Sequence, residues 1–595
     1  MKFRSLLVAN RGEIALRVMR TAKRMGLRTI AVYSDADRDA PHVRAADTAV
    51  HLGGSAPKDS YLNMKAILQA QGDAVHPGYG FLSESPDFAD AVLKSGRVWV
   101  GPPPAAITAM GDKANAKAIA AKAGVAVLPT YDGNPEYPVL IKAVAGGGGR
   151  GIRLVRSKEH LEAELTTARS EALHSFGDDR VILEKALEGA RHVEVQIFAD
   201  NHGNCIHLGE RDCSVQRRHQ KLVEESPSPA VNAKLRAEMG AAAIAAARAV
   251  GYVGAGTVEF LLGADGKFWF MEMNTRLQVE HPVTEATTGL DLVEWQLRVA
   301  AGEPLPAKQD GIRFSGHAIE VRLCAEDPER NFLPQAGILA RWRPSDAVRV
   351  DHALESGLTI PPFYDSMIAK LIAHAPTRDE ARAQLAAALD ETVALGIPTN
   401  KAFLAAVLRN EAFASGSVTT DFLSRNEIET EKARNSDYEI AAALLAGDYG
   451  EWTGWSNNPA HRSRARFAGE VVSFSFEDNI LRTRKELQHA VDGNTVHFAR
   501  GGSSFSFRNT LYDPPEKKGA GTSNGRLVAP MNGRVAAVNA KVGETVAAGK
   551  VLVVLEAMKM EHGLDFPFSL KVKAIHIRAG EQVAPGKLLV EFYPA

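Results

Sequence analysis

The stretch Phe268-Trp-Phe-Met-Glu272-Met-Asn274-Thr-Arg276-Leu-Gln278-Val-Glu280-His281-Pro282 carries a polar or charged residue at every second position from 272 to 280. If this run is extended, its even-numbered side chains project to one face and can carry ligands. The odd-numbered residues then face a core and anchor the run: Met271, Met273, Leu277 and Val279.

A second apolar run, Gly256-Thr-Val-Glu-Phe-Leu261, contributes one more carboxylate, Glu259. Glu259, Glu272 and Asn274 together offer two carboxylates and an amide oxygen. These are hard ligands suited to Mg²⁺ or Mn²⁺ bridging nucleotide phosphates, and not to zinc. The competing interpretation is a solvated edge strand that holds no ligand.

A glycine-rich loop separates two strand-like runs upstream, in Leu140-Ile-Lys142-Ala-Val-Ala-Gly146-Gly-Gly-Gly-Arg150-Gly151-Ile152-Arg-Leu-Val155. The loop matches G-x-G-x-x-G, but a dinucleotide site needs a helix after the glycines, and a β run follows here. Glycines let backbone amides approach phosphate oxygens, and Lys142 adds a positive charge toward the same anion. The pattern therefore predicts a hairpin lid over a triphosphate, since a plain glycine turn needs fewer glycines.

The C-terminal part of the chain contains an internal duplication. Val542-Gly543-Glu544 recurs as Ala579-Gly580-Glu581, and Pro530 matches Pro567, each pair 37 residues apart. Each half alternates apolar and polar residues between Gly or Pro turns. The duplication predicts a small β-sandwich, with Lys559 at the tip of the hairpin that joins its halves.

Lys559 lies within Glu556-Ala-Met-Lys-Met-Glu-His562. A lysine at an exposed turn is normally a solvated charge, but two exposed methionines beside it add nothing to a core, so something must recognise or use them. The segment resembles the biotinyl domain, in which the lysine ε-amine carries biotin. The lipoyl domain shares this architecture, but its lysine usually follows an acidic residue. One departure is that Phe568-Ser-Leu-Lys571 follows Pro567, where the family usually has a glycine in the turn.

Composition excludes several function classes. The 595-residue chain is 45% hydrophobic and 24% charged with a net charge of −1, so it has room for three or four domains and no basic field for nucleic acid or an anionic membrane. Its three cysteines, Cys205, Cys213 and Cys324, lack metal-binding spacing and suit a reducing compartment. Without a signal segment or an apolar run of membrane length, we expect a bacterial cytoplasmic protein, or a mitochondrial matrix protein already processed.

The pattern along the chain divides it into several units. Residues 3–33 alternate strand, helix and strand, and the alternation continues to about 110, which predicts a parallel α/β sheet. Strand-rich segments follow from 139 to 285, then mixed α/β to about 445, where a helical stretch from Glu439 ends at Gly447. Residues 464–511 predict a small β module with a turn at 492–494. Residues 513–525 predict a flexible tether that reaches at most roughly 45 Å.

Residues 1–447 resemble the ATP-grasp fold and, among its members, biotin carboxylase. The matching segments are 10–15 (NRGEIA), 76–81 (HPGYGF), 211–221 (RDCSVQRRHQK) and 272–282. The resemblance implies a multidomain α/β and β protein. The carboxylase unit would consist of a Rossmann-like (PreATP-grasp) N-terminal domain at 1–112, an ATP-grasp domain at 113–312 with its glycine-rich lid at about 126–195, and a biotin carboxylase C-terminal subdomain at 313–447. A β-rich partner-docking module at 448–512 would follow. The linker at 513–525 would then lead to a biotinyl β-sandwich at 526–595.

The same resemblance implies roles for individual residues. ATP would lie among Lys113, Lys142, Gly148, Gly149, Glu184, Lys185, Leu187, His192, Gln216 and His219, with Glu259, Glu272 and Asn274 holding the metal ions. Bicarbonate would be held by Lys221, Arg276, Gln278 and the amide of Val279, with Glu280 as the general base that prepares it to form carboxyphosphate. Arg322 would stabilise the biotin enolate, and Tyr79 would contact the biotin ring.

Two other functions remain open at this point. A helix usual in the family is missing between Gly124 and Tyr137, which allows a biotin-carrying scaffold whose shortened lid no longer supports turnover. An ATP-grasp carboxylate-amine ligase is the other alternative. Lys559 argues against the ligase, and the complete ligand set at 259–280 argues against the scaffold.

After these assignments no segment is left for a second active site, so a separate carboxyltransferase β subunit is implied. The 464–511 module lies where α subunits of acyl-CoA carboxylases carry a partner-docking domain, which favours that class over pyruvate carboxylase. The layout resembles the α subunits of methylcrotonyl-, geranyl- or propionyl-CoA carboxylases, and we favour the first two types. The resemblance also implies modification by a biotin protein ligase and a large hetero-oligomer of α and β subunits.

Overall fold

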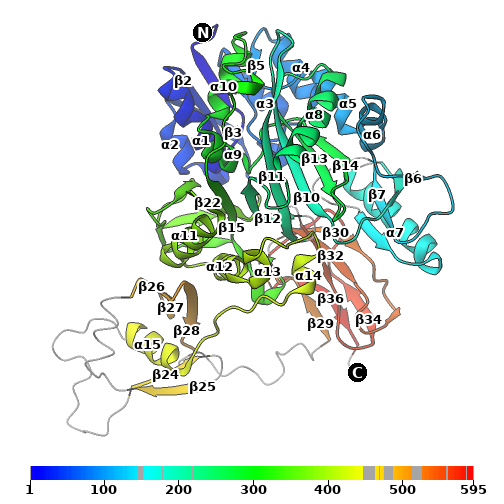
Figure 1. Cartoon of the computed structure of the whole chain (residues 1–595). Helices are drawn as coiled ribbons and strands as arrows, with labels where there is room; N and C mark the ends of the chain where they lie inside the picture. Colours follow the sequence, from blue (N-terminus) through cyan, green and yellow to red (C-terminus); the bar gives the residue numbers. More distant parts are fainter. Residues whose placement is uncertain are drawn as a thin grey trace.

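The computed structural model describes most of the chain, and Figure 1 shows its arrangement, with the N-terminal part in blue and the C-terminal domain in red. The described residues are 2–144, 152–176, 178–217, 220–445, 463–467, 470–474, 487–511, 513, 525–531, 533–557, 560–584 and 586–593. Four predicted site residues, Gly148, Gly149, His219 and Lys559, lie outside these ranges.

The N-terminal domain is the predicted parallel α/β sheet. β1 (Ser5–Val8), α1 (Gly12–Arg24) and β2 (Arg28–Ser34) confirm the expected strand, helix and strand. The strand order is β3-β2-β1-β4-β5, with β3 at Thr48–Gly53, β4 at Ala74–His76 and β5 at Val98–Trp99. The order reverses between β1 and β4, and ligands of such sheets bind beyond the carboxyl ends of the strands at this point. The segments that follow these two strands carry Asn10 and Tyr79.

An eight-stranded antiparallel sheet forms the centre of the molecule, in the order β14-β13-β10-β11-β12-β15-β22-β20. Its strands are β14 (Phe268–Asn274), β13 (Gly254–Leu262), β10 (Arg191–Ala199), β11 (Cys205–Arg217), β12 (Gln220–Ser226), β15 (His317–Cys324), β22 (Met367–Ala375) and β20 (Arg349–His352). The β12–β15 pairing carries the sheet without interruption from the predicted ATP-grasp domain into the predicted C-terminal subdomain.

Alternation in β10 explains how this sheet presents polar groups. Val193, Val195 and Ile197 enter a core that also contains Met239 and Ala243 of α8 (Ala233–Ala249). Because successive side chains point to opposite faces, the even-numbered residues of β10 must project from the other side of the sheet.

The lid is a four-stranded sheet, β6-β9-β7-β8, with the helix α7 (Lys158–Phe176) packed on β7 and β8. Its strands are β6 (Thr130–Tyr131), β9 (Val181–Lys185), β7 (Val139–Ala143) and β8 (Ile152–Val155). Antiparallel pairing of Lys142 with Ile152 confirms the predicted strand, loop and strand on either side of the glycines. Residues 124–137 are all described and contain no helix, as the short sequence there predicts.

The prediction that 272–280 is one extended run is wrong beyond Asn274. A β-bulge between Glu259 and Phe260 shifts the β13–β14 register, and Met271 lines the cavity described below while also packing against a small apolar cluster. The strand then ends, and Pro282 favours the start of α9 (His281–Thr288) because proline suits the first helical turn. Val279 also lines the cavity, whereas Met273 and Leu277 are buried as predicted.

The β module consists of the hairpin β24–β25 and the sheet β26-β27-β28. The strands are β24 (Ser463–Phe467), β25 (Glu470–Phe474), β26 (His489–Asp492), β27 (Thr495–Arg500) and β28 (Ser503–Arg508), with the predicted turn between β26 and β27. The helix α15 (Asn435–Leu445), which we expected to close the catalytic unit, packs on this module instead. Its Ala441 and Leu444 share a core with Phe467 and Phe498.

The C-terminal domain is the predicted duplicated sandwich, with sheets β29-β36-β34-β31 and β33-β32-β30-β35. The strands are β29 (Arg526–Val528), β30 (Gly533–Val538), β31 (Thr545–Val546), β32 (Val553–Ala557), β33 (Met560–Leu564), β34 (Leu570–Ile575), β35 (Gln582–Val583) and β36 (Leu588–Phe592). Pairing of Ala557 with Met560 confirms the hairpin whose turn was predicted to carry Lys559.

None of the helices in the described part of the chain combines the length and the apolar composition needed to cross a membrane.

Candidate active site

A cavity of about 2330 Å³ lies between the central sheet, the lid and the segments that follow β1 and β4. Most of the predicted site residues line it: Tyr79, Lys113, Lys142, Glu184, Leu187, His192, Gln216, Lys221, Glu259, Glu272, Asn274, Arg276, Gln278, Val279 and Arg322. Lys185 does not, because its half-exposed side chain pairs with Glu136 at 3.6 Å. Glu280 is fully buried behind the lining.

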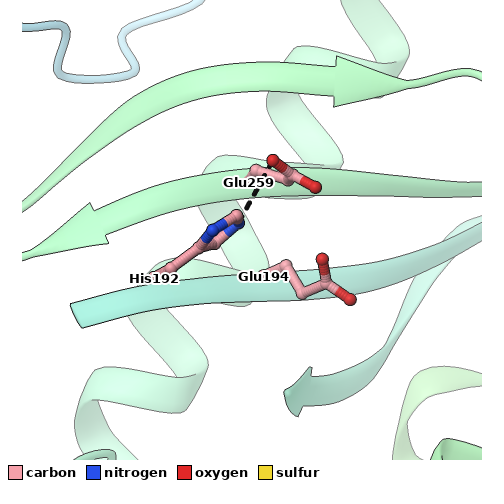
Figure 2. A group of neighbouring side chains, drawn as sticks. All are labelled: His192, Glu194 and Glu259. Carbon is pink, nitrogen blue, oxygen red and sulfur yellow. Dashed lines mark ion pairs between the residues drawn. The ribbon is translucent and has the colours of Figure 1, made fainter. Parts of the chain in front are cut away.

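Strand register places three carboxylates in one row across the sheet. Glu194 pairs with Glu259 between β10 and β13, and Glu259 pairs with Glu272 between β13 and β14. Figure 2 shows Glu194 and Glu259 side by side, with the ring of His192 turned to Glu259 at 3.1 Å. Like charges directly opposite each other destabilise a sheet, so the row needs compensating cations.

Lys221 supplies the first of these cations from β12. Its ammonium lies 2.5 Å from Glu194, 2.8 Å from Glu259 and 2.6 Å from Glu280. Burial alone would lower the pKa of Lys221, but the three carboxylates raise it well above its ordinary value. Lys221 is therefore held as a cation, and it offsets the negative charge of Glu194 and Glu259. The second cation beside the row is Arg211, which lies 2.5 Å from Glu194.

Arg322, from β15, lies beside Glu280 and not beside the row. Its guanidinium lies 2.5 Å from Glu224 and 2.9 Å from Glu280. Burial raises the pKa of Glu224 to about 7, partly offset by Arg322. Burial would raise the pKa of Glu280, but Lys221 and then Arg322 lower it well below the ordinary range. Both oxygens of Glu280 thus accept from cations, and it can take up a proton only after one of them is displaced.

Arg276 lies beyond the end of β14, and three side chains hold its guanidinium. It donates to Glu84 at 2.9 Å, to the amide oxygen of Gln278 at 2.6 Å and to that of Asn274 at 3.1 Å. The amide nitrogen of Asn274 donates in turn to Glu259 at 2.9 Å. These contacts bring the residues predicted for bicarbonate and for metal into one network.

The base of the lid carries a second buried charge cluster. Glu184 on β9 lies 2.9 Å from Lys117 and 3.1 Å from Lys142. Burial lowers the pKa of Lys117, and Glu184 partly offsets this. An anion with several negative charges, such as a polyphosphate, can compete with Glu184 for both ammonium groups.

The carboxylates on this sheet fit a divalent cation. Burial and the adjacent Glu259 raise the pKa of Glu272. The charge of Glu272 is therefore less well compensated than that of Glu259. A hard cation between the two carboxylates would remove this repulsion, and both are preferred ligands of Mg²⁺. Asn274 fits less directly, because its amide oxygen accepts from Arg276.

Several residues of the site were not predicted from the sequence: Lys117, Glu194, Glu224 and Lys370. Lys370 stands in the largely apolar strand β22, and Glu194 lies between His192 and Gln196 in a row of even-numbered polar residues of β10. These patterns are the signals that could have drawn attention to them. Such a signal indicates a buried polar partner, but it does not say which one.

Four family descriptions match successive parts of the chain. They are "Biotin carboxylase, N-terminal domain" at residues 2–107, "Carbamoyl-phosphate synthase L chain, ATP binding domain" at 112–308, "Biotin carboxylase C-terminal domain" at 320–425 and "Biotin-requiring enzyme" at 525–592. The methylcrotonoyl-CoA carboxylase subunit alpha, mitochondrial, of Dictyostelium discoideum is 42% identical, covering 95% of this chain and 92% of its own. The propionyl-CoA carboxylase alpha chain of Ruegeria pomeroyi is 40% identical over 94% of this chain and 95% of its own.

The chain belongs to the family of biotin-carrying alpha subunits of acyl-CoA carboxylases.

Members of this family are ATP-dependent biotin carboxylases, and solved structures agree over the carboxylase unit of this one. The biotin carboxylase domain of Hydrogenobacter thermophilus 2-oxoglutarate carboxylase, solved with MgADP and bicarbonate, has a TM-score of 0.69 at 43% identity, covering 71% of this chain and 98% of its own. Campylobacter jejuni biotin carboxylase, solved as a β-γ-ATP complex, has a TM-score of 0.69 at 44% identity, with 71% and 99% covered. As a family member, this chain uses ATP, bicarbonate, Mg²⁺ and biotin.

Proposed function

We propose that this chain carboxylates the biotin on its own Lys559 and that the roles predicted for its cavity residues hold individually. The observation that carries this proposal is the chain of contacts from Lys221 through Glu280 to Arg322, buried at the end of a cavity that also contains the lid lysine Lys142. It combines a carboxylate that can act as a base with cations that can bind anionic substrates, and the reaction needs both.

Nucleotide binding falls to the lid and the sheet face beneath it. Lys113, Lys142 and the glycines 148 and 149 would hold the phosphates, and Leu187, His192, Gln216 and His219 the rest of the nucleotide. Glu259 and Glu272, with Asn274 after rotation of its amide, would hold Mg²⁺ or Mn²⁺, which neutralises phosphate charge when bound. The side chain of Lys185 is directed elsewhere, so we assign it no contact through its ammonium.

Proton removal follows from the two occupied oxygens of Glu280. A bicarbonate anion beside Arg276, Gln278 and the amide of Val279 competes for the ammonium of Lys221. When Lys221 turns to that anion, Glu280 loses the largest influence that lowers its pKa, and it becomes basic enough to accept the bicarbonate proton. The deprotonated oxygen then bonds to the γ-phosphorus of ATP as the bond to ADP breaks.

Tyr79 and Arg322 would face the biotin ring near the same place. Tyr79 follows β4 at the crevice of the parallel sheet, and Arg322 is already charged and fixed by Glu224. A preorganised guanidinium stabilises negative charge that develops on a neighbouring oxygen.

The chain would pass its carboxyl group to a separate carboxyltransferase beta subunit, because its relatives are named alpha subunits or alpha chains. We favour 3-methylcrotonyl-CoA or geranyl-CoA as the acceptor, and the named methylcrotonoyl-CoA carboxylase relatives support the first. A biotin protein ligase would modify Lys559, the β module would dock the partner, and the complex would be a large hetero-oligomer. The protein would work in the bacterial cytoplasm, or in the mitochondrial matrix; several relatives are named as mitochondrial.

The decisive test is bicarbonate-dependent ATP hydrolysis by the isolated chain with added free biotin, after its intact mass has shown whether Lys559 is modified. Adduct and bicarbonate-dependent turnover together are expected. An adduct without turnover would overturn the proposal in favour of a biotin-carrying scaffold with an inactive lid. Turnover that requires an amine in place of biotin would favour a carboxylate-amine ligase.

A further inference from the structure

Two adjacent, partly buried residues of the carboxylase unit pack against the cores of different domains. Phe332 packs against the core formed by β15, β22 and the helices beside them. Leu333, the next residue, packs against the core of the C-terminal sandwich, which includes Met531, Val535 and Val583. The carboxylase unit therefore touches the sandwich through a leucine side chain.

The turn that presents Leu333 has an unusual backbone. Asn331 and Phe332 have φ values of 56° and 58° and lie between a short 3-10 turn (Pro328–Arg330) and the strand β17 (Leu333–Pro334). Residues other than glycine rarely adopt this left-handed conformation, and phenylalanine less often than asparagine. Strained conformations of this kind persist only where surrounding contacts enforce them, and they concentrate at functional sites.

The ring of Phe332 is held on two sides. The guanidinium of Arg217 lies 4.3 Å from its centroid, and the ring of Phe403 packs edge-on with a centroid distance of 4.9 Å. Arg217 is itself fixed by Glu326 at 3.4 Å. These contacts anchor the turn in the carboxylase unit and leave Leu333 directed to the sandwich.

The sandwich that rests on Leu333 has one edge in the active-site cavity. Gly533, Arg534, Glu556, Gln582 and Val583 line the same cavity as Lys221 and Arg322. Arg534 of β30 and Glu556 of β32 form an ion pair at 2.5 Å on this edge, and β32 is the strand that leads into the hairpin of Lys559. Figure 1 shows the sandwich beside the end of the central sheet that carries β10 and β14.

We propose that the turn Asn331-Phe332-Leu333 is a docking element that holds the biotinyl domain of the same chain at the carboxylase site. This inference rests on the proposed function, and it adds the surface on which the carrier domain sits. The occupant is the chain's own sandwich, because that domain is seated on Leu333 in the structure. A contact through one leucine is small enough to release the domain for its visit to the partner subunit.

The test compares two reactions of the full-length, biotinylated chain carrying Leu333→Asp. The rate at which labelled bicarbonate is incorporated into the biotin of the chain should fall at least tenfold. ATP hydrolysis supported by free biotin should change less than twofold, since Leu333 contributes nothing to the cavity chemistry. Leu333→Ala should give a smaller loss of about threefold with the same selectivity, and Leu333→Met should give none.

The matched control is Ile338→Asp, which places the same charge on an apolar residue of the same subdomain that is already 53% exposed. It should leave both rates unchanged. Self-carboxylation that survives both Leu333→Asp and Leu333→Ala would overturn the inference, as would a rate per chain that rises in proportion to protein concentration. Absence of free-biotin turnover in the unaltered chain would instead count against the proposed function.

Discussion

The ammonium of Lys370 lies 2.8 Å from the carbonyl oxygen of Val279. Lys370 belongs to β22 and is completely buried, and it also lies 3.4 Å from Glu13 of α1. One side chain therefore ties the segment that precedes Glu280 to both the central sheet and the N-terminal domain. Burial raises the pKa of Glu13 to about 7, although Lys370 opposes the shift.

Replacing Lys370 by methionine should weaken bicarbonate use selectively, because Val279 and Glu280 lose their support while the nucleotide site keeps its residues. A hydrogen bond to a charged group is worth about 1.5–3 kcal/mol, so kcat/KM for bicarbonate should fall about 10- to 100-fold. The KM for ATP should stay within about threefold. Lys401→Met is the control, since it removes another buried lysine that does not line the cavity. An equal effect of both variants would contradict the prediction.

Glu280→Gln should abolish proton removal while keeping the shape of the site, because the amide oxygen can still accept from Lys221. Loss of a general base typically costs 10²- to 10⁴-fold in rate, and we expect a loss of about this size in bicarbonate-dependent phosphate release. Nucleotide affinity, measured by displacement of a fluorescent ADP analogue, should be little changed. A variant retaining more than about a tenth of the activity would show that another group accepts the proton.

Lys559→Arg should separate the two halves of the reaction. Intact mass should reveal no biotin adduct, and labelled bicarbonate should no longer be incorporated into the chain. Hydrolysis of ATP with free biotin should persist, because free biotin replaces the attached biotin as the acceptor. Adduct that survives this substitution would place the modification on another lysine.

Lys401 joins α12 (Lys401–Arg409) to the β module by donating to the carbonyl groups of Leu389 and Gly502. Burial lowers its pKa from 10.5 to about 8. Between these values the unfolded chain binds more protons than the folded chain, so the free energy of unfolding should rise with pH across this window, by at most about 3 kcal/mol. Below pH 8, where Lys401 is protonated in both states, its buried charge lowers the free energy of unfolding by the full amount. Denaturant unfolding at pH 7.5 and at pH 10 measures this difference. The free energy of unfolding should rise between the two pH values in the unaltered chain and not in Lys401→Met.

The three cysteines should be inert in the folded protein. Cys205, Cys213 and Cys324 are all buried, and burial raises the pKa of each thiol, that of Cys205 to about 11. The thiolate is the reactive form, so an aromatic disulfide reagent at pH 8 should label none in native buffer and all three in denaturant. Rapid labelling of the native chain would contradict this prediction.

Local patterns in the sequence were enough to predict the parallel sheet, the lid hairpin and the duplicated sandwich. Alternation, turn residues and a repeat of fixed length are properties of neighbouring residues, and Gly533 and Leu570 do begin equivalent strands 37 positions apart. The pairing of Glu259 with Glu272 could also be anticipated, because both stand in short runs joined by a tight turn.

Tertiary contacts decided the features that the sequence did not predict. The prediction from the alternation at 272–280 took no account of the bulge beside Met271 or of Pro282. Each changes the direction of side chains without changing the polarity pattern of the sequence. The apolar face of α15 indicated burial, but not that its partners would be Phe467 and Phe498. Lys370 reaches Val279 from 91 positions away, and no local pattern specifies such a distance.

The row of Glu194, Glu259 and Glu272 ties the catalytic groups to the pairing of three strands. Inserting or deleting one residue within β10 or β13 would turn every later side chain of that strand to the opposite face. A change in chain length that keeps these carboxylates on one face must therefore fall in the connections, such as the turn from Gly263 to Lys267. The segment 124–137 lies outside every strand of the central sheet, so a change in its length would leave the row of carboxylates in place.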